Sequence, residues 1–137
     1  KGDEITVPLL ENEEGIYAVG VLSILDEQGK ALKLYDANIK TSHTYQKVLS
    51  TLPDKINETV KKYSCKIYSC LQGQGYGRAD FRISEDGTPY FLEMAPLPLL
   101  APYSSFNRCA LLKGMGSEEV FQQIVQAACR KYKIDSH

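Results

Sequence analysis

The run RADFRISEDGTPYFLEMA, residues 78–95, decides the fold, because it has the pattern of two strands joined by a tight turn. The pair Asp86-Gly87 stands between two alternating runs, which is the strongest short-range signal of a β-hairpin. A two-residue turn there fixes the register of the whole hairpin. The resulting pairs are Glu85 with Thr88, Ile83 with Tyr90, Phe81 with Leu92, and Asp80 with Glu93. One face then carries the expected core residues, which are Phe81, Ile83, Tyr90 and Leu92.

The other face of the hairpin places two carboxylates, those of Asp80 and Glu93, directly opposite each other. Like charges in this position destabilise a sheet, so the pair needs an explanation. In one interpretation the face is solvated, and the guanidinium of Arg82 shields both acids. In the other the acids bind a divalent cation, because Mg²⁺ is typically held by one or two carboxylates plus substrate phosphates. Arg78 lies on the same side, where it could clamp a phosphate or a developing negative charge.

The composition is that of an ordinary globular protein and excludes several classes of function. The 137 residues fit one domain, with 43% hydrophobic and 24% charged residues. The net charge is −1 without a basic run, which argues against nucleic acid or a membrane surface as partner. No apolar stretch reaches the roughly 18 to 20 residues of a membrane span. The four cysteines include no CxxC pair, which favours free buried thiols in a reduced cytoplasm.

The remaining segments predict an α+β fold with a mainly antiparallel sheet flanked by helices. Runs at 5–10, 16–25 and 30–36 predict three strands, and the polar segment 37–53 predicts a loop. A helix predicted from Asp54 places on one face Ile56, Val60, Tyr63, Ile67 and Cys70. The Pro-rich run 95–102 excludes helix and central strand. A last helix is predicted to be capped by Ser117, with acidic residues in its first turn and basic residues near its end.

The sequence does not support a phosphate-binding loop or a histidine-dependent catalytic arrangement. Gly73, Gly75 and Gly77 suggest a phosphate loop, but they follow a helix and precede a strand, the reverse of the order that such loops need. The only histidines are His43 and His137, so no Ser/His/Asp or Cys/His arrangement can be argued.

The hairpin and its surroundings resemble those of a known enzyme group. GYGRADFRISEDGTPYFLEMAPLP, residues 75–98, is similar to the metal-binding hairpin of the ATP-grasp ligases, in particular the D-alanine–D-alanine ligase group. That group shows a Gly-x-x-Arg-x-Asp strand, a turn, and then Leu-Glu-x-Asn-x-x-Pro. Three further segments resemble the group in the same order along the chain: GDEITVPLL (2–10), YDANIK (35–40) and the run that begins with PLPLLAPYSS at Pro96.

The resemblance implies a fold and a set of roles. The fold would be the ATP-grasp C-terminal subdomain, and the cofactors would be ATP and Mg²⁺ or Mn²⁺. Asp80 and Glu93 would hold the metal, and Arg78 would stabilise the acyl-phosphate transition state. Glu4 would face the nucleotide ribose, Lys40 would bind phosphate, and Leu92, with a neighbour such as Met94, would pack on adenine. Ser104 is favoured by its spacing from Glu93 as a binder of the substrate carboxylate, with Ser105 as the alternative.

Three departures from the group's pattern are visible. Ala95 stands where the group has its asparagine, so one oxygen ligand is missing on the metal face. Leu99, Leu100 and Ala101 replace a Gly-Met-Thr that presents backbone amides to the substrate, and this bulk argues against D-alanine as the substrate. The ligases of this group are also longer. Residues 1–137 would therefore be a single C-terminal domain of a longer protein, whose N-terminal and lid domains are missing.

Three hypotheses follow for the function. The first is an ATP- and Mg²⁺-dependent ligase that joins a carboxylate to an amine through an acyl phosphate, with small amino-acid-like substrates. This chain alone would then be inactive. The second is a degenerate nucleotide- or metal-binding module, in which Ala95 marks the lost ligand. The third is an interaction domain whose acid pair is merely solvated.

Overall fold

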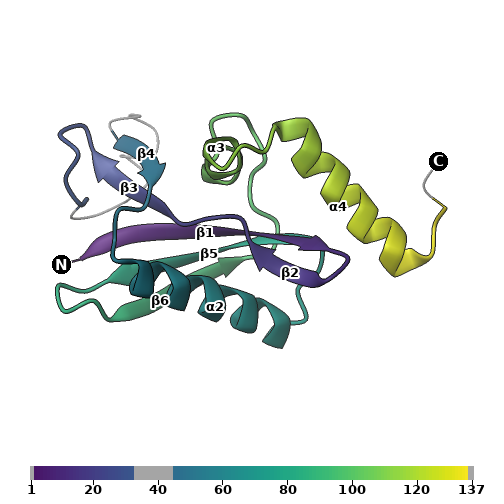
Figure 1. The fold of residues 1–137 in the computed structure, drawn as a ribbon, viewed down its shortest axis with the longest axis horizontal. Helices are drawn as coiled ribbons and strands as arrows, with labels where there is room; N and C mark the ends of the chain where they lie inside the picture. Colours follow the sequence, from purple (N-terminus) through teal and green to yellow (C-terminus); the bar gives the residue numbers. More distant parts are fainter. Residues whose placement is uncertain (1, 33–44, 136–137) are drawn as a thin grey trace.

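The computed structural model describes residues 2–32 and 45–135, and their strands form a single antiparallel sheet (Figure 1). In chain order the elements are β1 (Asp3–Asn12), β2 (Gly15–Ala18), β3 (Leu22–Asp26), β4 (Tyr45–Leu49), α2 (Asp54–Cys70), β5 (Tyr76–Ile83), β6 (Pro89–Ala95), α3 (Ser105–Leu112) and α4 (Ser117–Tyr132). The strands lie in the order β4-β3-β1-β5-β6, and β2 pairs with the far end of β1. The prediction of an antiparallel sheet flanked by helices is confirmed.

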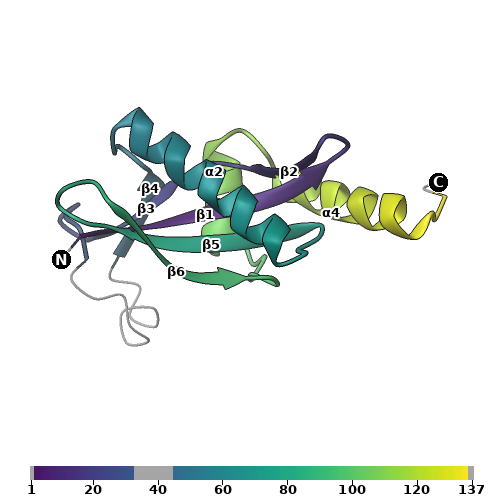
Figure 2. The same cartoon turned by 90° about the horizontal axis from the view of Figure 1, so that it is seen from below.

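The central strand β1 has two different faces, which organise the whole domain. Its odd-numbered residues Ile5, Val7 and Leu9 are fully buried and pack with Phe81 of β5 and Val60 of α2 in one core cluster. Helix α2 covers this side of the sheet (Figure 2). On the other face, α4 lies over the end of β1 that pairs with β2, and α3 extends over β3 and β4.

Helices α3 and α4 pack against parts of that second face. Leu10 packs there against Phe106 of α3 and Val120 of α4. Leu22 and Ile24 of β3 pack against Cys109, also on α3. Glu4 and Thr6, the even-numbered positions nearer the start of β1, lie on this face as well, but they line a pocket and do not belong to these clusters.

The hairpin of β5 and β6 keeps the predicted pairing of Asp80 with Glu93 but reaches it differently. Its loop has three residues rather than two, because the amide of Ser84 donates to the carbonyl of Thr88 at 3.0 Å. Gly87 has a φ of 84°, the left-handed conformation that a three-residue hairpin loop requires at its end. The longer loop moves the neighbouring pairs by one residue.

A β-bulge on β6 moves the register back. Phe81 faces Phe91, not Leu92, and Leu92 is the extra residue of the bulge. The predicted pairs of Phe81 with Leu92 and of Ile83 with Tyr90 are therefore wrong. Phe81 and Ile83 are buried as predicted, whereas Tyr90 is 58% and Leu92 50% exposed, so neither of the latter belongs to the core.

Two of the predicted strands are also corrected. The run 16–25 is not one strand, because it breaks between β2 and β3 at Gly20. A Cβ at Gly20 would lie 3.0 Å from Sγ of Cys109, so the chain passes close beneath α3. The predicted loop 37–53 contains β4, whose side chains are mostly half-buried. Of the predicted strand 30–36, Ala31 forms an isolated bridge with Leu25, and residues 33–36 lie outside the described range.

The helix α2 begins at Asp54 as predicted but turns a different face to the core. Val60, Ser64 and Tyr68 are buried, whereas Tyr63 is 45% exposed. The Tyr68 hydroxyl donates to the carbonyl of Gln74 at 3.1 Å and to that of Tyr76. This polar anchor explains why Tyr68 rather than Tyr63 turns inward.

Two glycines after α2, Gly73 and Gly77, pack against the ring of Tyr68. A Cβ at Gly73 or Gly77 would clash with the ring of Tyr68. The glycine-rich run therefore makes room for a buried ring, which agrees with its rejection as a phosphate loop.

Helix α3 was not predicted, although Ser104 gives an N-cap signal: its Oγ accepts a hydrogen bond from the amide of Asn107 at 3.1 Å. Helix α4 is confirmed, with Gly116 rather than Ser117 as its N-cap.

All four cysteines are free, yet only Cys109 is fully buried. Among the described residues, no helix combines the length and the apolar character needed to cross a membrane.

Candidate functional site

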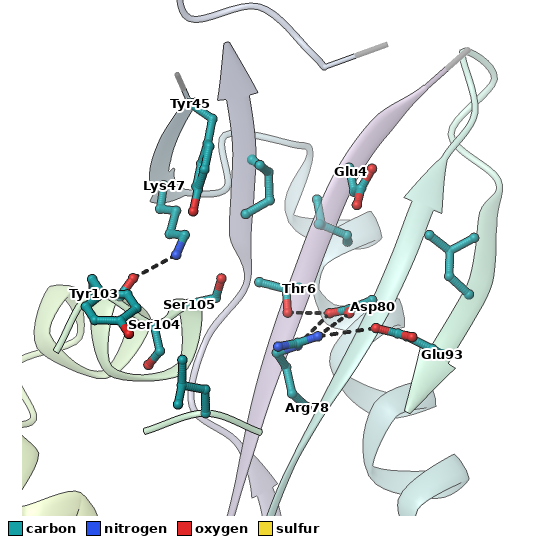
Figure 3. Close-up of a pocket in the computed structure, with 14 residues that line it drawn as sticks. Glu4, Thr6, Tyr45, Lys47, Arg78, Asp80, Glu93, Tyr103, Ser104 and Ser105 are labelled. Atoms are coloured by element: carbon teal, nitrogen blue, oxygen red, sulfur yellow. Dashed lines mark hydrogen bonds and ion pairs between the residues drawn. The ribbon is translucent and has the colours of Figure 1, made fainter. Parts of the chain in front are cut away.

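The antiparallel register brings polar side chains of several strands together on the face of the sheet opposite α2. Thr6 of β1 pairs with Asp80 of β5, and Asp80 pairs with Glu93 of β6. Residues paired across neighbouring strands project from the same face. All three line a pocket of about 650 Å³ with Arg78 and Ser104 (Figure 3).

The acid pair shares one guanidinium group. Arg78 donates to Asp80 through Nε at 3.0 Å and through Nη2 at 2.7 Å, which is the two-point geometry that arginine forms with a carboxylate. The same Nη2 lies 3.3 Å from Oε1 of Glu93. Thr6 donates its hydroxyl to Asp80 Oδ1 at 2.6 Å. The repulsion expected between Asp80 and Glu93 is thus relieved within the protein.

The two acids, Asp80 and Glu93, differ in how deeply they are buried. The side chain of Asp80 is 15% exposed and that of Glu93 is 62% exposed. The shielding that the sequence assigned to Arg82 is supplied by Arg78, and Arg82 pairs with Glu4 at 2.7 Å. Because Asp80 is largely buried and held at several points, the site is not a freely solvated face.

Asp80 and Glu93 could hold a metal ion if phosphate groups supply further ligands. Within residues 2–32 and 45–135 no group of three or more histidine, cysteine, aspartate or glutamate side chains could hold a metal. Asp80 and Glu93 offer two carboxylates, and Ala95, which pairs with Arg78, offers no side-chain oxygen. Mg²⁺ keeps several waters and uses substrate phosphates as ligands, so two carboxylates suit it when phosphates are present. The ion would compete with Arg78 for the same oxygens.

The loop before α3 forms another wall of the pocket. Asn107 is buried and donates through Nδ2 to the carbonyls of Leu100 and Ala101, which fixes the loop against the helix. Ser104 is 6% exposed and lines the pocket together with Ser105. Asn107 of α3 therefore fixes the conformation of the loop that precedes this helix.

Other predicted residues fall in different places. Glu4 and Leu92 line the pocket, the latter as the bulged residue. Met94 pairs with Ala79 and packs against the core cluster on the α2 side, so it cannot share a surface with Leu92. Lys40 lies outside the described residues.

Several residues of the pocket, among them Thr6, Tyr45 and Lys47, were missed by the sequence reasoning. Thr6 is two positions after Glu4 on a strand, so the alternation of β1 could have identified it. Tyr45 and Lys47 also alternate, in a segment that was predicted to be a loop.

A second pocket, of about 710 Å³, lies between the β1–β2 turn and the end of α4. There Glu11 accepts the amide of Gly75 at 2.7 Å through its carboxylate, and Arg130 at 3.3 Å through its carbonyl. Both contacts engage these side chains with backbone groups. The first pocket is the better candidate site.

Comparison with known proteins gives a consistent result. The chain matches the family model described as D-ala D-ala ligase C-terminus over residues 1–126. It is 30% identical over 138 residues to a D-alanine–D-alanine ligase of Cupriavidus metallidurans, covering 99% of this chain and 41% of that protein. The chain thus spans about two fifths of the length of the curated relatives it matches.

Solved structures of D-alanine–D-alanine ligases contain the same fold. The fold superimposes on a D-alanine–D-alanine ligase from Bacillus anthracis complexed with ATP, with a TM-score of 0.74 at 23% identity, covering 97% of this chain and 40% of that one. For the ligase of Coxiella burnetii the TM-score is 0.77 at 14% identity, with 97% and 33% covered. The predicted fold class, an ATP-grasp C-terminal subdomain, is confirmed. From its matched family model and its hairpin, this chain belongs to the D-ala D-ala ligase C-terminus family.

Proposed function

We propose that this chain is the nucleotide- and metal-binding part of an ATP-dependent ligase that joins a carboxylate to an amine. The observation that carries the proposal is the joint placement of Arg78, Asp80 and Glu93 on one wall of a 650 Å³ pocket. A cation flanked by two carboxylates is suited to phosphate chemistry, because both positive charge and metal ligands are then available. Family membership supports the same class of reaction.

The reaction would have two steps. A carboxylate oxygen of the first substrate attacks the terminal phosphorus of ATP, and ADP leaves. The amine of the second substrate then attacks the acyl carbon, and phosphate leaves. Asp80 and Glu93 would hold Mg²⁺, which when bound neutralises phosphate charge. Arg78 would face the oxygens of the transferring phosphoryl group and of the acyl phosphate.

The other residues would position the substrates. Glu4 would accept hydrogen bonds from the ribose, and Leu92 would pack against the base. Ser104 would donate its hydroxyl to a substrate carboxylate. Lys40 would contact phosphate. Small amino-acid-like compounds are the proposed substrates, and residues beyond the two fifths of the relatives' length that this chain spans would complete the site.

A second candidate function is nucleotide or metal binding without catalysis. Ala95 favours it, since this residue pairs with Arg78 on the metal-facing side and has no oxygen in its side chain. In that case the pocket would bind nucleotide, while the lost ligand would prevent turnover even in a longer protein.

A thermal-shift experiment with a non-hydrolysable ATP analogue and Mg²⁺ tests the binding that both candidates require. A ligand at a hundred times its Kd stabilises the folded state by about 2.7 kcal/mol. We expect stabilisation of the wild type and its loss in Asp80→Asn. Glu58→Gln, which alters an exposed carboxylate on α2, is the matched control. No stabilisation of the wild type at millimolar analogue would rule out the proposal.

A further inference from the structure

Thr6 lies on the central strand β1 and contacts the more deeply buried of the two acids. It pairs with Asp80 of β5, so both side chains project from the same face of the sheet. The hydroxyl of Thr6 donates to Oδ1 of Asp80 at 2.6 Å (Figure 3). Thr6 is 4% exposed, and its neighbours Ile5 and Val7 on the strand are fully buried. The hydroxyl donor is therefore carried by a strand that the core holds in place.

A positive charge supplies further contacts of Asp80. Nε of Arg78 lies 3.0 Å from Oδ1 of Asp80, and Nη2 lies 2.7 Å from Oδ2. A divalent cation bound to this carboxylate would repel the guanidinium group, because both are positive. The hydroxyl of Thr6 is neutral and causes no such repulsion. Thr6 can therefore keep its contact with Oδ1 when the guanidinium group gives up Oδ2 to a cation.

The two acids differ in what holds them once Arg78 is displaced. Glu93 lies on the edge strand β6, is 62% exposed, and is contacted by the same Nη2 at 3.3 Å. The carboxylate of an aspartate rotates easily about χ2, because this torsion has no sharp minima. A donor bound to Oδ1 of Asp80 restricts that rotation, and the β-branched side chain of Thr6 is itself stiff at χ1. The contact therefore fixes the direction in which Oδ2 of Asp80 points.

We infer that Thr6 is a positioning residue of the metal site: it holds Oδ1 of Asp80, so that the carboxylate keeps its orientation when a divalent cation replaces Arg78 at Oδ2. The inference rests on the proposed function only for the assignment of a metal ion to Asp80 and Glu93. Removing a group that orients a metal ligand through a hydrogen bond typically lowers metal affinity by about 10- to 100-fold. Such a group does not need to contact the ion.

The alternative role of the Thr6 hydroxyl is purely structural, as a donor that satisfies a buried carboxylate in the metal-free fold. Thr6→Val removes the hydroxyl and keeps the branched shape, which suits a strand. Thr6→Ser keeps the hydroxyl. Thr51→Val, at an exposed position between β4 and α2, is the matched control. A structural hydroxyl would affect only the midpoint of urea unfolding, whereas a positioning hydroxyl would affect metal affinity.

The experiment titrates the chain with Mn²⁺, with and without a non-hydrolysable ATP analogue, and measures free Mn²⁺ by electron paramagnetic resonance. Urea unfolding without metal shows that each variant is folded. We expect Thr6→Val to bind Mn²⁺ at least about tenfold more weakly than the wild type. Thr6→Ser should recover most of this affinity, and Thr51→Val should bind Mn²⁺ as the wild type does.

A second background separates an effect on Asp80 from an effect on the ion pair. Arg78→Gln removes the competing charge, so Mn²⁺ alone should bind this variant at least as tightly as the wild type. If Thr6 orients Asp80 itself, adding Thr6→Val to Arg78→Gln should still weaken Mn²⁺ binding about tenfold. An effect that disappears in this background would overturn the inference, because the hydroxyl would then act only through Arg78.

Equal Mn²⁺ affinities of the wild type and Thr6→Val would also overturn it, as would a loss that Thr6→Ser does not recover. If the wild type binds the analogue with Mn²⁺ and Thr6→Val binds both equally well, the role of Thr6 alone is rejected. If Mn²⁺ binding depends on Thr6 but no analogue binds, the role of Thr6 is retained and the nucleotide proposal is rejected. No Mn²⁺ binding by the wild type under either condition would reject both.

Discussion

Arg78 and Asp80 lie two residues apart on β5 and are joined by two nitrogen–oxygen contacts of 3.0 and 2.7 Å. Since the same guanidinium reaches Glu93, one positive charge already offsets part of the negative charge of the two carboxylates in the metal-free site. A cation arriving at the two carboxylates therefore has to displace part of an existing ion pair. This relationship sets the expected behaviour of variants at the site.

Restoring an oxygen ligand should tighten metal binding. Ala95→Asn adds an amide opposite Arg78, so we expect Mn²⁺ or Mg²⁺ to bind more tightly in the presence of a non-hydrolysable ATP analogue. Ala95→Leu, of similar size but without oxygen, is the control. Titration calorimetry measures the affinities, and equal affinities for all three proteins would contradict the metal assignment.

Removing one acid should weaken the metal site with little effect on the fold. Glu93→Gln loses a charged ligand, so metal affinity should fall. Because Glu93 is 62% exposed and its partner Arg78 keeps Asp80, we expect the free energy of unfolding to stay within about 0.5 kcal/mol. Urea unfolding and metal titration test the two parts. A large loss of stability together with unchanged metal affinity would show that Glu93 is structural.

Deleting Leu92 should separate base packing from metal binding. Leu92 is the extra residue of the bulge, so its deletion makes β6 regular and leaves Asp80 opposite Glu93. We expect analogue affinity to fall about three- to tenfold through lost apolar contact, while the metal affinity stays unchanged. Leu92→Ala, which keeps the bulge, should give a similar loss. Full analogue affinity in the deletion variant would remove Leu92 from the nucleotide site.

The hydroxyl of Tyr68 should contribute measurably to stability. Tyr68→Phe leaves the carbonyls of Gln74 and Tyr76 without this donor, so we expect a loss of about 1–3 kcal/mol in urea unfolding. Tyr63→Phe, at a position 45% exposed, is the control and should change stability by less than about 0.5 kcal/mol. Equal effects of the two substitutions would refute the anchoring role.

The cysteines should differ in reactivity and in their link to pH. Burial raises the pKa of the Cys109 thiol to about 12, whereas Cys70 is exposed. Iodoacetamide at pH 8 should therefore modify Cys70 in the folded protein and Cys109 only after unfolding. Because the pKa is raised in the folded state, the stability contributed by the neutral thiol is present below about pH 9 and is lost towards pH 12. Peptide mass mapping and unfolding at several pH values check both expectations.

The hairpin shows which strand pairs and core residues could be predicted from the sequence. Its alternating residues and Asp-Gly signal predicted the facing acids correctly, because the extra loop residue and the bulge shift the register in opposite directions and cancel at Asp80. The glycine at 87 fits a three-residue loop as well as a two-residue one, so the Asp-Gly signal alone did not distinguish them. Phe81 and Ile83 were placed correctly in the core, but Tyr90 and Leu92 were not, since they lie between the two shifts.

Elsewhere the errors arose where tertiary contacts decide the structure. β4 is polar in sequence and is held as a strand by pairing with β3, so Lys47 and Tyr45 were not recognised as pocket residues. Tyr68 turns inward to reach two backbone carbonyls, which a helical period cannot foresee. The roles of Glu4, Arg78 and Ser104 came from resemblance to a family, and the structure adds that they line one pocket.

The alternation of β1 makes this strand unusually intolerant of insertions and deletions. Its odd positions, such as Ile5 and Val7, belong to the core, and its even positions, Glu4 and Thr6, line the pocket. A slip of one residue would exchange the two sets, because the side-chain period of a strand is two. Point substitutions at Glu4 and Thr6, however, do not alter the core cluster that contains Ile5 and Val7. The pocket can therefore diverge in chemistry by single substitutions while the length of β1 stays fixed.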